Sequence, residues 1–588
     1  MSSLPSPLTI CDLHTAYAAG VPVADVLQEI FARIKAVNDP GIFLHLASLA
    51  ELDMHIQALG AYDPERPLWG VPFVVKDNID VADMPTTAAC PDWAYTPAKD
   101  AFAIARLRAA GAIPIGKTNL DQFATGLVGI RTPWPVPRNA LDAEIVPGGS
   151  SSGSAVAVGH GIVPFSLGTD TAGSGRVPAA LNGIVGLKPT LGMVSATGVV
   201  PACRTLDTIS VFARSVTDAH AVLQAMAGYD PADAYARDIP ATPLRPAPPH
   251  VKVGIPDPAT REFFGDALQA AAFDANLGAL RNRGAQIVEL DFTPFYDVAN
   301  MLYDGAWVAE RHTVIETLLA QKPDAVHPVT RAIIGKAEGL SATDAFRGIY
   351  RLAELRRICA PLIASVDLLA VPSIPTFYTL ADLDVDPITP NTNLGTYTNF
   401  VNLLDLCALT VPMSPRADGR PGSLTLIAPA GHDARLAAEA LALSGQAVAA
   451  PDAASGDEIA LAVCGAHMSG LPLNHQLASL GGRFVRTTET APCYSFHALA
   501  GGPPDRPGLV REAKGGARIA LEIWALPKRA LGHLMCQIPA PLGLGSIVLC
   551  DGSQVTGFLC EAAGTDGARD ITALGGWRAY LSQGVAAQ

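Results

Sequence analysis

Two glycine- and serine-rich segments hold the residues with the clearest capacity for chemistry. They are residues 148–154 (GGSSSGS) and residues 168–176 (GTDTAGSGR). Hydrolysis of an amide needs a nucleophile, a proton carrier and hydrogen-bond donors for the developing oxyanion. Ser174 follows the small-residue turn 171–173, whose successive backbone N–H groups can converge on one point. The pattern therefore predicts a serine nucleophile with an oxyanion hole made from main chain.

A serine nucleophile requires a base, and none of the 13 histidines lies in a recognisable acylase context. Lys76 ends the apolar run 70–75 (GVPFVV), where desolvation disfavours its charged form. A lysine that is neutral near pH 7 can accept a proton. Alternatively, Lys76 is a surface residue at the end of a strand, and the Gly/Ser loop is a turn or an anion-binding nest.

Taken in order, these segments resemble the amidase signature family. Lys76 precedes GGSSSGS and then GTDTAGS, and the resemblance covers roughly residues 60–205, including GIVGLKPT at 183–190. In that family the lysine is the base, the first serine of the SS run relays the proton through a cis peptide, and the distal serine attacks. The resemblance implies a Ser-Ser-Lys triad of Lys76, Ser150 and Ser174. It also implies an oxyanion hole made by the N–H groups of Thr171, Ala172, Gly173 and Ser174.

Two further patterns offer other chemistry. Residues 111–118 (GAIPIGKT) match the phosphate-loop pattern GxxxxGK[ST]. Pro114 removes one N–H group that would cradle a phosphate and the intervening residues are apolar, so we do not expect nucleotide binding. Asp170 and Arg176 flank Ser174 and could be a catalytic carboxylate and a substrate clamp. We favour an ion pair that fixes the loop.

Amidase chemistry alone does not identify the amide, so other residues must select the substrate. The helical pattern over residues 301–318 places Tyr303, Trp307 and Arg311 on one face, because spacings of four advance by about one turn. An aromatic stripe of this kind usually belongs to a core. A buried Arg311, however, needs an anion, either a protein carboxylate such as Glu310 or a carboxylate of the substrate.

Over its whole length the chain resembles the allophanate hydrolase family. It carries VCGAHMSGLPLN at 463–474, and DQFATGLVGIRTP at 121–133 is similar to that family's substrate loop. In that family a tyrosine and an arginine eight residues later hold the substrate carboxylate, which implies substrate-binding roles for Tyr303 and Arg311, and the loop implies one for Gly126. The implied reaction cleaves the terminal amide of allophanate, a urea with a carboxylate on one nitrogen, to ammonia and N-carboxycarbamate.

Three other functions remain open at this point. One is another amidase-signature amidase, malonamidase-like or acting on aliphatic amides. A second is an A-type amidotransferase subunit, which would pass ammonia to a companion chain. The third is a non-enzymatic scaffold, which would leave Lys76, Ser150 and Ser174 unexplained.

The elements that must position these residues point to an α/β fold. Helices are expected at 23–37, 47–59 and 101–111, and buried strands at 70–76 and 113–116. Strands that alternate with helices indicate an α/β architecture. The resemblance implies an amidase-signature fold with a central mixed β-sheet covered by helices.

A composition change divides the chain. Residues 447–457 (AVAAPDAASGD) form the expected linker between a first domain, 1–446, and a second, 458–588, and the Pro-rich residues 241–250 are expected to be a surface connection within the first domain. Short strands are expected at 459–463, 518–524, 546–549 and 555–559. The second domain resembles the gamma-glutamylcyclotransferase-like fold, a small β-rich mixed barrel. Residues 534–538 contain no acid, so cyclotransferase activity is not expected.

In the allophanate hydrolase family the second domain is associated with decarboxylation of N-carboxycarbamate. His467 is the candidate here to hold the carboxylate or manage the proton, although a histidine that only stabilises its turn fits the sequence nearly as well. His475, His497 and Glu522 are weaker candidates. No metal-ligand spacing such as HxxxH accompanies them, so no metal or other cofactor is expected.

Composition limits the partners and the compartment. The chain has 588 residues, 49% hydrophobic and 16% charged, with a net charge of −14 and no Lys/Arg run, which argues against a nucleic-acid partner. Ten cysteines without a CxxC pair, no secretory signal and no apolar run of about 20 residues predict a cytoplasmic protein without a membrane span. The expected ligand is a small anionic amide. The resemblance implies a homodimer and a link to a urea-carboxylating enzyme, in urea or cyanuric acid degradation.

Overall fold

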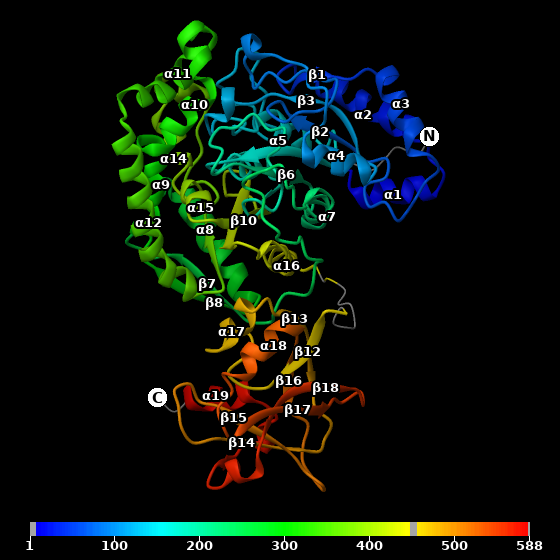
Figure 1. Ribbon diagram of the computed structural model, residues 1–588, viewed down its shortest axis with the longest axis vertical. Helices are drawn as coiled ribbons and strands as arrows, with labels where there is room; N and C mark the ends of the chain where they lie inside the picture. Colours follow the sequence, from blue (N-terminus) through cyan, green and yellow to red (C-terminus); the bar gives the residue numbers. More distant parts are fainter. Residues whose placement is uncertain (1–7, 447, 449–455, 586–588) are drawn as a thin grey trace. The chain divides into compact units, whose positions relative to one another are not determined.

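The computed structural model describes residues 8–446, 448 and 456–585 (Figure 1). These residues form two compact units. The first comprises the chain up to Pro243, Val253–Leu280 and Ile287–Ala440, and the second comprises the rest of the described chain. Most of the predicted linker 447–457 lies outside the described residues.

The Pro-rich segment does not stay within the first unit as predicted. Leu244–Lys252 and Arg281–Gln286 belong to the second unit. Arg245 forms an ion pair with Glu458, 3.3 Å from Nη2 to Oε2, which ties this segment to the first strand after the predicted linker. The segment is therefore integrated into the second unit and is not a free surface connection.

An eleven-stranded mixed sheet runs through the described part of the first unit. In sheet order, the strands are β1 (Phe43–Leu46), β3 (Ile113–Thr118), β2 (Pro72–Lys76), β4 (Phe165–Asp170), β6 (Thr208–Ala213), β5 (Val185–Lys188), β10 (Leu406–Met413), β11 (Gly422–Pro429), β9 (Leu368–Val371), β7 (Val251–Pro256) and β8 (Ala285–Leu290). β2 is parallel to both β3 and β4, whereas β4 is antiparallel to β6. The carboxyl ends of β2, β3 and β4 consequently meet at one edge of the sheet.

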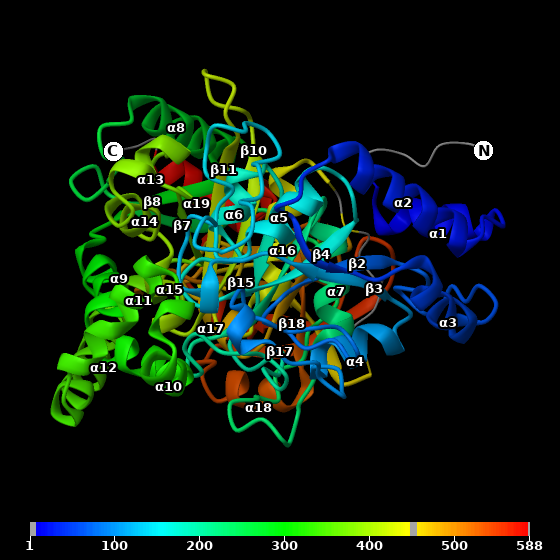
Figure 2. The ribbon, with the colours of Figure 1, turned by 90° about the horizontal axis from the view of Figure 1, so that it is seen from above.

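Helices cover this sheet. They are α1 (Ile10–Ala18), α2 (Val23–Val37), α3 (Leu49–Leu59), α4 (Phe102–Ala109), α5 (Ser152–Gly159), α6 (Val177–Leu181), α7 (Val216–Met226), α8 (Ala267–Asn282), α9 (Thr293–Asp304), α10 (Ala306–Gln321), α11 (Pro328–Gly335), α12 (Ala342–Ala364), α13 (Leu380–Val385), α14 (Thr389–Leu394), α15 (Asn399–Leu403) and α16 (Asp433–Leu443). Figures 1 and 2 show α9–α12 gathered on one side of the unit and α1–α3 on the opposite side. The predicted α/β class, with a central mixed sheet covered by helices, is confirmed.

Local sequence explains several of these elements. α2 has the predicted bounds and buries Val23, Val26, Leu27 and Ile30, which share one helical face. α3 begins two residues later than predicted, where Ser48 and Glu51 form a capping box. The strands predicted at 70–76 and 113–116 are β2 and β3, and both are fully buried.

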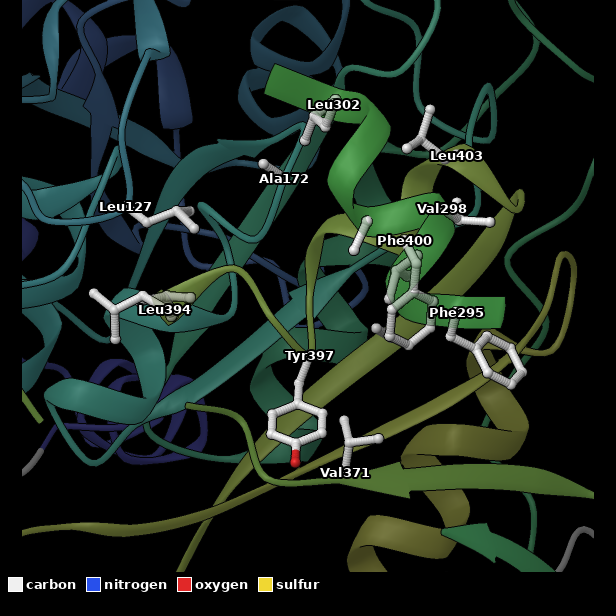
Figure 3. Packing of buried hydrophobic residues seen from close by; sticks show 14 of the residues in the cluster. Leu127, Ala172, Phe295, Val298, Leu302, Val371, Leu394, Tyr397, Phe400 and Leu403 are labelled. Carbon is white, nitrogen blue, oxygen red and sulfur yellow. The ribbon is translucent and has the colours of Figure 1, made fainter. Parts of the chain in front are cut away.

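A hydrophobic cluster connects the loops that carry the candidate residues with the helices around them. Figure 3 shows Leu127, from the loop 121–133, and Ala172, from the loop after β4, in the same cluster as Leu302 of α9 and Phe400 of α15. All four side chains are at most 2% exposed. Because protein cores pack densely, this cluster holds the two loops in fixed positions.

The second unit is rich in β-structure, as predicted. A five-stranded sheet contains β13 (Arg483–Glu489), β16 (Ala520–Pro527), β12 (Glu458–Val463), β18 (Gln554–Cys560) and β17 (Leu542–Val548), and a three-stranded sheet contains β15 (Pro507–Arg511), β14 (Tyr494–Ala498) and β19 (Arg569–Asp570). The helices are α17 (Asn474–Ser479), α18 (Lys528–Met535) and α19 (Trp577–Val585). β12 is parallel to β18 and antiparallel to β16, so the larger sheet is mixed.

Helix length and the cysteines bear on the predicted absence of a membrane span and on the predicted compartment. None of the helices described here combines the length and apolarity that crossing a bilayer requires. All ten cysteines have free thiols.

Candidate active site

Lys76 lies at the end of β2, completely buried. Its Nζ is 2.7 Å from Ser150 Oγ and 2.7 Å from Thr169 Oγ1. Burial lowers the pKa of Lys76 to about 7, even though Asp121, Asp207 and Asp170 act in the opposite direction. The amine can therefore exist uncharged near neutral pH, which is the property that a general base needs.

Ser150 precedes α5, and the Gly149–Ser150 peptide bond is cis, as the family resemblance implies. A Cβ on Gly149 would clash with Asp121 Oδ2, so only glycine fits there. The carbonyl of Ser150 accepts a hydrogen bond of 3.0 Å from the N–H of Asp121. These contacts fix Ser150 beside Lys76.

Ser174 lies in the loop that follows β4, the neighbour of β2 in the sheet. Its side chain is 2% exposed and makes no hydrogen bond with another residue that the structure describes. Gly173 has φ +138°, and a Cβ there would clash with Thr398 Oγ1. Glycine is thus required immediately before the candidate nucleophile.

The backbone N–H groups of this loop do not all remain available for an oxyanion. The N–H of Gly173 donates to Asp170 Oδ1 at 3.1 Å. The N–H groups of Thr171, Ala172 and Ser174 have no acceptor among the described residues. Gly173 therefore contributes to the predicted oxyanion hole mainly through its conformation.

The predicted single helix 301–318 is wrong. α9 ends at Asp304 and α10 begins at Ala306, and between them Gly305 adopts extended backbone, φ −129° and ψ −151°. Glycine is among the weakest helix formers, so a break at Gly305 costs little. Tyr303 and Arg311 consequently lie on different helices. They nevertheless meet, with Arg311 Cζ 5.3 Å from the centre of the Tyr303 ring.

Arg311 is 1% exposed and only partly satisfied. Its Nη1 donates to Thr125 Oγ1 at 3.3 Å, whereas Nε and Nη2 are buried without an acceptor among the described residues. Glu310 is not its partner, because Glu310 accepts hydrogen bonds from the N–H and hydroxyl of Thr205, at 2.8 and 2.7 Å. Unpaired N–H groups on a buried guanidinium are costly, which favours an anionic ligand as the missing partner.

Gly126 lies next to Thr125 and packs against Asp121. A Cβ on Gly126 would lie 2.5 Å from Asp121 Oδ2. The Asp121 carboxylate also accepts hydrogen bonds from the N–H groups of Gly129 and Arg131, both at 2.9 Å. Asp121 thus shapes the loop 121–133, and this contact is one physical reason for glycine at 126.

The residues that matched a phosphate loop do not form one. Residues 113–118 are strand β3, and Lys117 is fully buried. Lys117 Nζ lies 3.1 Å from Asp77 Oδ1 and donates to the carbonyl of Pro85 and the hydroxyl of Thr86. Lys117 therefore has protein partners, and the prediction against nucleotide binding at this segment has structural support.

In the second unit, His467 lies in the turn after β12. Its Nε2 is 2.9 Å from Gln476 Oε1, and its ring stacks on Phe558 at 4.9 Å between centroids. Burial lowers the pKa of His467, which favours the neutral imidazole. The ring lines a cavity of about 190 Å³ within this unit.

The weaker candidates of the second unit lie elsewhere. Glu522 is fully buried and accepts hydrogen bonds from Ser469, Trp524 and Arg578. His475 contacts the carbonyl of Pro472, and His497 contacts Ser495 Oγ. None of these three candidates lines the cavity. Glu522 instead holds the turn of His467 through Ser469.

Comparison with known proteins agrees with this geometry. Residues 25–437 match the family described as amidase. The chain belongs to the amidase family. Residues 459–582 match the allophanate hydrolase C-terminal domain, so this amidase carries that domain after its catalytic one.

Relatives of this amidase share its two-part organisation or its first part. A urea amidolyase of Saccharomyces cerevisiae is 42% identical over 544 residues, which cover 88% of this chain and 30% of the yeast protein. The chain thus spans less than a third of that relative. A solved structure of Kluyveromyces lactis allophanate hydrolase aligns with a TM-score of 0.78 and 38% identity over 99% of this chain and 100% of that one. The A-type subunit of the glutamyl-tRNA(Gln) amidotransferase of Chloroflexus aggregans is 35% identical over 71% of this chain and 92% of its own.

These matches confirm the resemblance to the amidase signature and allophanate hydrolase families, and with it the amidase-signature fold. The predicted class, an amidohydrolase, is confirmed as well.

Two residues around the candidate site carry no signal in the sequence. Thr169 Oγ1 is a second partner of Lys76 Nζ. Asp207 accepts from the hydroxyl of Thr171 and from the N–H groups of Ala202 and Cys203, and burial raises its pKa to about 6. No local pattern marks Asp207, because it precedes β6 whereas its partner Thr171 follows β4.

Asp170 and Arg176 form the predicted ion pair. Arg176 donates from Nε to Asp170 Oδ2 at 2.9 Å and from Nη2 to Oδ1 at 2.8 Å, and both side chains are completely buried. Although burial raises the pKa of Asp170, the charge of Arg176 holds it below its usual value. The pair occupies both carboxylate oxygens and so supports the loop of Ser174.

Removing one member of this pair is expected to destabilise the amidase. Arg176→Met leaves a buried carboxylate unpaired, and loss of one partner of a buried pair costs about 3–5 kcal/mol of unfolding free energy. Urea unfolding followed by tryptophan fluorescence measures this. Arg347→Met is the control, because Arg347 is 74% exposed in its pair with Asp344 and should matter little. Equal losses in both variants would contradict a supporting role for the buried pair.

Proposed function

We propose that this amidase is an allophanate hydrolase that releases ammonia from the terminal carboxamide of allophanate. The observation that carries the proposal is the buried guanidinium of Arg311, whose Nε and Nη2 have no acceptor among the described residues and which lies next to Tyr303 and Thr125. A small amide with its own carboxylate supplies the anion that this site lacks. The similarity to the Kluyveromyces lactis allophanate hydrolase over 99% of the chain supports the same substrate.

The acylation half of the reaction uses Lys76, Ser150 and Ser174. Neutral Lys76 accepts the proton of Ser150 across their 2.7 Å contact. Ser150 in turn takes the proton of Ser174 across a hydroxyl–hydroxyl contact that must tighten when the substrate binds. Ser174 Oγ attacks the terminal carboxamide carbon. The N–H groups of Thr171, Ala172 and Ser174 stabilise the oxyanion, with Gly173 holding the turn. The proton then returns to the leaving nitrogen, and ammonia departs.

The deacylation half reverses the proton path. Water attacks the carbamoyl-type acyl-enzyme, passing a proton toward Ser150 and Lys76, and Ser174 is regenerated. The product is N-carboxycarbamate, which carries two carboxylates. No cofactor is required for either half.

Arg311, Tyr303 and Gly126 position the substrate. The Arg311 guanidinium binds the carboxylate, Tyr303 lies against the guanidinium, and Gly126 allows close approach of the loop next to Thr125. Positioning a small substrate in near-attack geometry can contribute several kcal/mol toward the barrier.

The second domain, the partner enzyme and the compartment belong to the same proposal. We take 1–446 as the catalytic domain, 447–457 as the linker and 458–588 as the domain that assists decarboxylation of N-carboxycarbamate, with His467 at its site, so that the net products are ammonia and carbon dioxide. The urea amidolyase relative supports a link to a urea-carboxylating enzyme. A cytoplasmic homodimer completes the proposal. Both urea and cyanuric acid degradation pass through allophanate, so either pathway is compatible with it.

Substrate comparison tests the proposal directly. The purified full chain is incubated with allophanate, malonamide or acetamide, and ammonia and carbon dioxide are quantified. We expect ammonia release to be fastest from allophanate and slow from the two neutral amides. Faster release from acetamide would assign the protein to the aliphatic amidases instead.

An A-type amidotransferase subunit is the second candidate, because the Chloroflexus aggregans relative matches 71% of the chain. That similarity leaves the region matching the allophanate hydrolase C-terminal domain unexplained. Ammonia release by the purified single chain, without a companion, separates the two functions.

Arg311→Ala is expected to lower kcat/KM for anionic substrates more than for neutral ones. Loss of a charge-assisted contact to the carboxylate should lower kcat/KM for allophanate by about tenfold or more. A neutral amide such as malonamide lacks the carboxylate and should lose little. Steady-state kinetics on both substrates measure the difference, and equal loss on both would remove Arg311 from carboxylate binding.

A further inference from the structure

The cavity of about 190 Å³ in the second unit is not part of the amidase site. Its wall comes from the end of β12 and the turn after it, α17, the segment that leads into β15, the stretch from the end of α18 to the start of β17, and β18. Most of the lining side chains are apolar, and the polar ones include His467, Gln476, Arg506 and Gln537. No acidic side chain is present among the described residues of this wall.

Arg506 gives the wall its positive charge. The side chain is half-buried, and its guanidinium makes no hydrogen bond or ion pair with any residue in the described part of the chain. Two other arginines of the unit do have partners: Arg578 pairs with Glu522 at 2.9 Å, and Arg511 donates to Tyr494 Oη at 3.0 Å. The guanidinium has no protein partner and the wall carries no acid. Arg506 can therefore bind the carboxylate of a ligand.

His467 is held in one orientation on the same wall. Gln476 Oε1 accepts from Nε2, and Phe558 stacks on the ring. A neutral imidazole that carries its proton on Nε2 leaves Nδ1 as a hydrogen-bond acceptor. The wall therefore combines a cation with a fixed neutral acceptor.

We infer that Arg506 binds one carboxylate of a small dicarboxylate in this cavity, beside His467. The inference rests on the proposed function, because N-carboxycarbamate, the product of the amidase step, is such a dicarboxylate. Arg506 then determines which carboxylate is retained and which departs.

The chemistry balances without a further reactant besides water. One N–C bond of N-carboxycarbamate breaks, its electron pair stays on nitrogen, and nitrogen takes a proton from water. The departing carbon dioxide combines with the resulting hydroxide to give bicarbonate, and carbamate remains. With the retained carboxylate on Arg506, the departing one lies against apolar groups such as Val463 and Leu534, where a charge is poorly solvated and its loss is favoured.

Malonate is a stable probe, because it replaces the central N–H of N-carboxycarbamate with a methylene. Titration calorimetry of the full chain is performed in an Arg311→Ala background, which weakens the amidase site. Adding Arg506→Gln should raise the Kd of malonate by about tenfold or more, since a charge-assisted contact is lost. Arg506→Lys retains the charge but not the planar pair of N–H donors that can bind both carboxylate oxygens, so it should give an intermediate Kd. Arg529→Gln, an exposed arginine of α18 outside the cavity, should leave the Kd unchanged.

A second readout follows ¹³C-labelled allophanate by NMR. Arg506→Gln should slow the disappearance of N-carboxycarbamate relative to Arg529→Gln. An unchanged malonate Kd in Arg506→Gln, or equal changes in both glutamine variants, would overturn the inference. If the wild-type chain releases no ammonia from allophanate, the proposed function fails, and malonate binding still reports on Arg506 alone.

Discussion

Ser174→Ala is expected to abolish ammonia release from allophanate. In the proposed mechanism the hydroxyl oxygen of Ser174 becomes acylated, and this hydroxyl makes no hydrogen bond to another described residue. Loss of the nucleophile from a triad that acts as a unit lowers turnover by a factor on the order of 10⁵ or more. A coupled ammonia assay at saturating allophanate measures the effect.

Ser152→Ala is the matched control, since Ser152 belongs to the same serine run and its hydroxyl makes one long contact of 3.4 Å to the carbonyl of Asn119. Its activity should stay close to that of the wild type. The urea unfolding midpoint of Ser174→Ala should match that of the wild type, which verifies that the variant is folded. More than about a tenth of wild-type turnover in Ser174→Ala would place the nucleophile elsewhere.

The candidate site can be predicted from the sequence because its residues stand at the ends of elements. Lys76 closes a run of apolar residues, and a run of that kind predicts a buried strand and hence a desolvated amine. The small residues before Ser174 predict a turn that only glycine permits, and Gly173 has the required positive φ. Burial and turn geometry are local properties, so a local pattern can carry them.

Contacts between residues that are far apart in the chain could not be predicted from the sequence in this way. Asp207 meets Thr171 from the start of another strand, and Thr169 meets Lys76 from the neighbouring strand. The apolar spacing of residues 301–318 does not distinguish a continuous helix from two helices broken at Gly305, because both keep that spacing. Gly305 itself is a weak signal, since isolated glycines are tolerated inside helices. Arg506 has no motif around it, and the case for it as an anion-binding residue depends on a wall assembled from five separate segments.

The Asp170 contact to Gly173 illustrates why a family pattern does not assign each atom. The four N–H groups of 171–174 are equivalent in the sequence. The structure divides them, because Asp170 accepts from Gly173 while its ion pair with Arg176 fixes the carboxylate. The same carboxylate thereby sets which N–H groups can point toward an oxyanion.

The second large effect is expected at Lys76 and appears in the pH dependence of the reaction. Burial lowers the pKa of Lys76 to about 7, and only the neutral amine accepts a proton. For the wild type, kcat/KM should therefore rise with pH through about 7 and level off above it. Lys76→Ala removes the proposed base and should lower kcat/KM by roughly 10²–10⁴. Initial rates of ammonia release at pH values from about 5 to about 9 record both effects.

Lys188 is the control for this rise of kcat/KM with pH. It is also a completely buried lysine, with a pKa that burial lowers to about 8, but its Nζ donates to the carbonyls of Pro189 and Leu406. Lys188→Met can lower the stability of the protein. It should leave the pH midpoint of the rise in kcat/KM unchanged, because Lys188 does not contact Ser150. A small primary amine added to Lys76→Ala should restore part of the activity, by occupying the space of the lost side chain. A rise in kcat/KM near pH 7 that persists in Lys76→Ala would show that another group controls the proton, and the Lys76–Ser150 contact would then be structural.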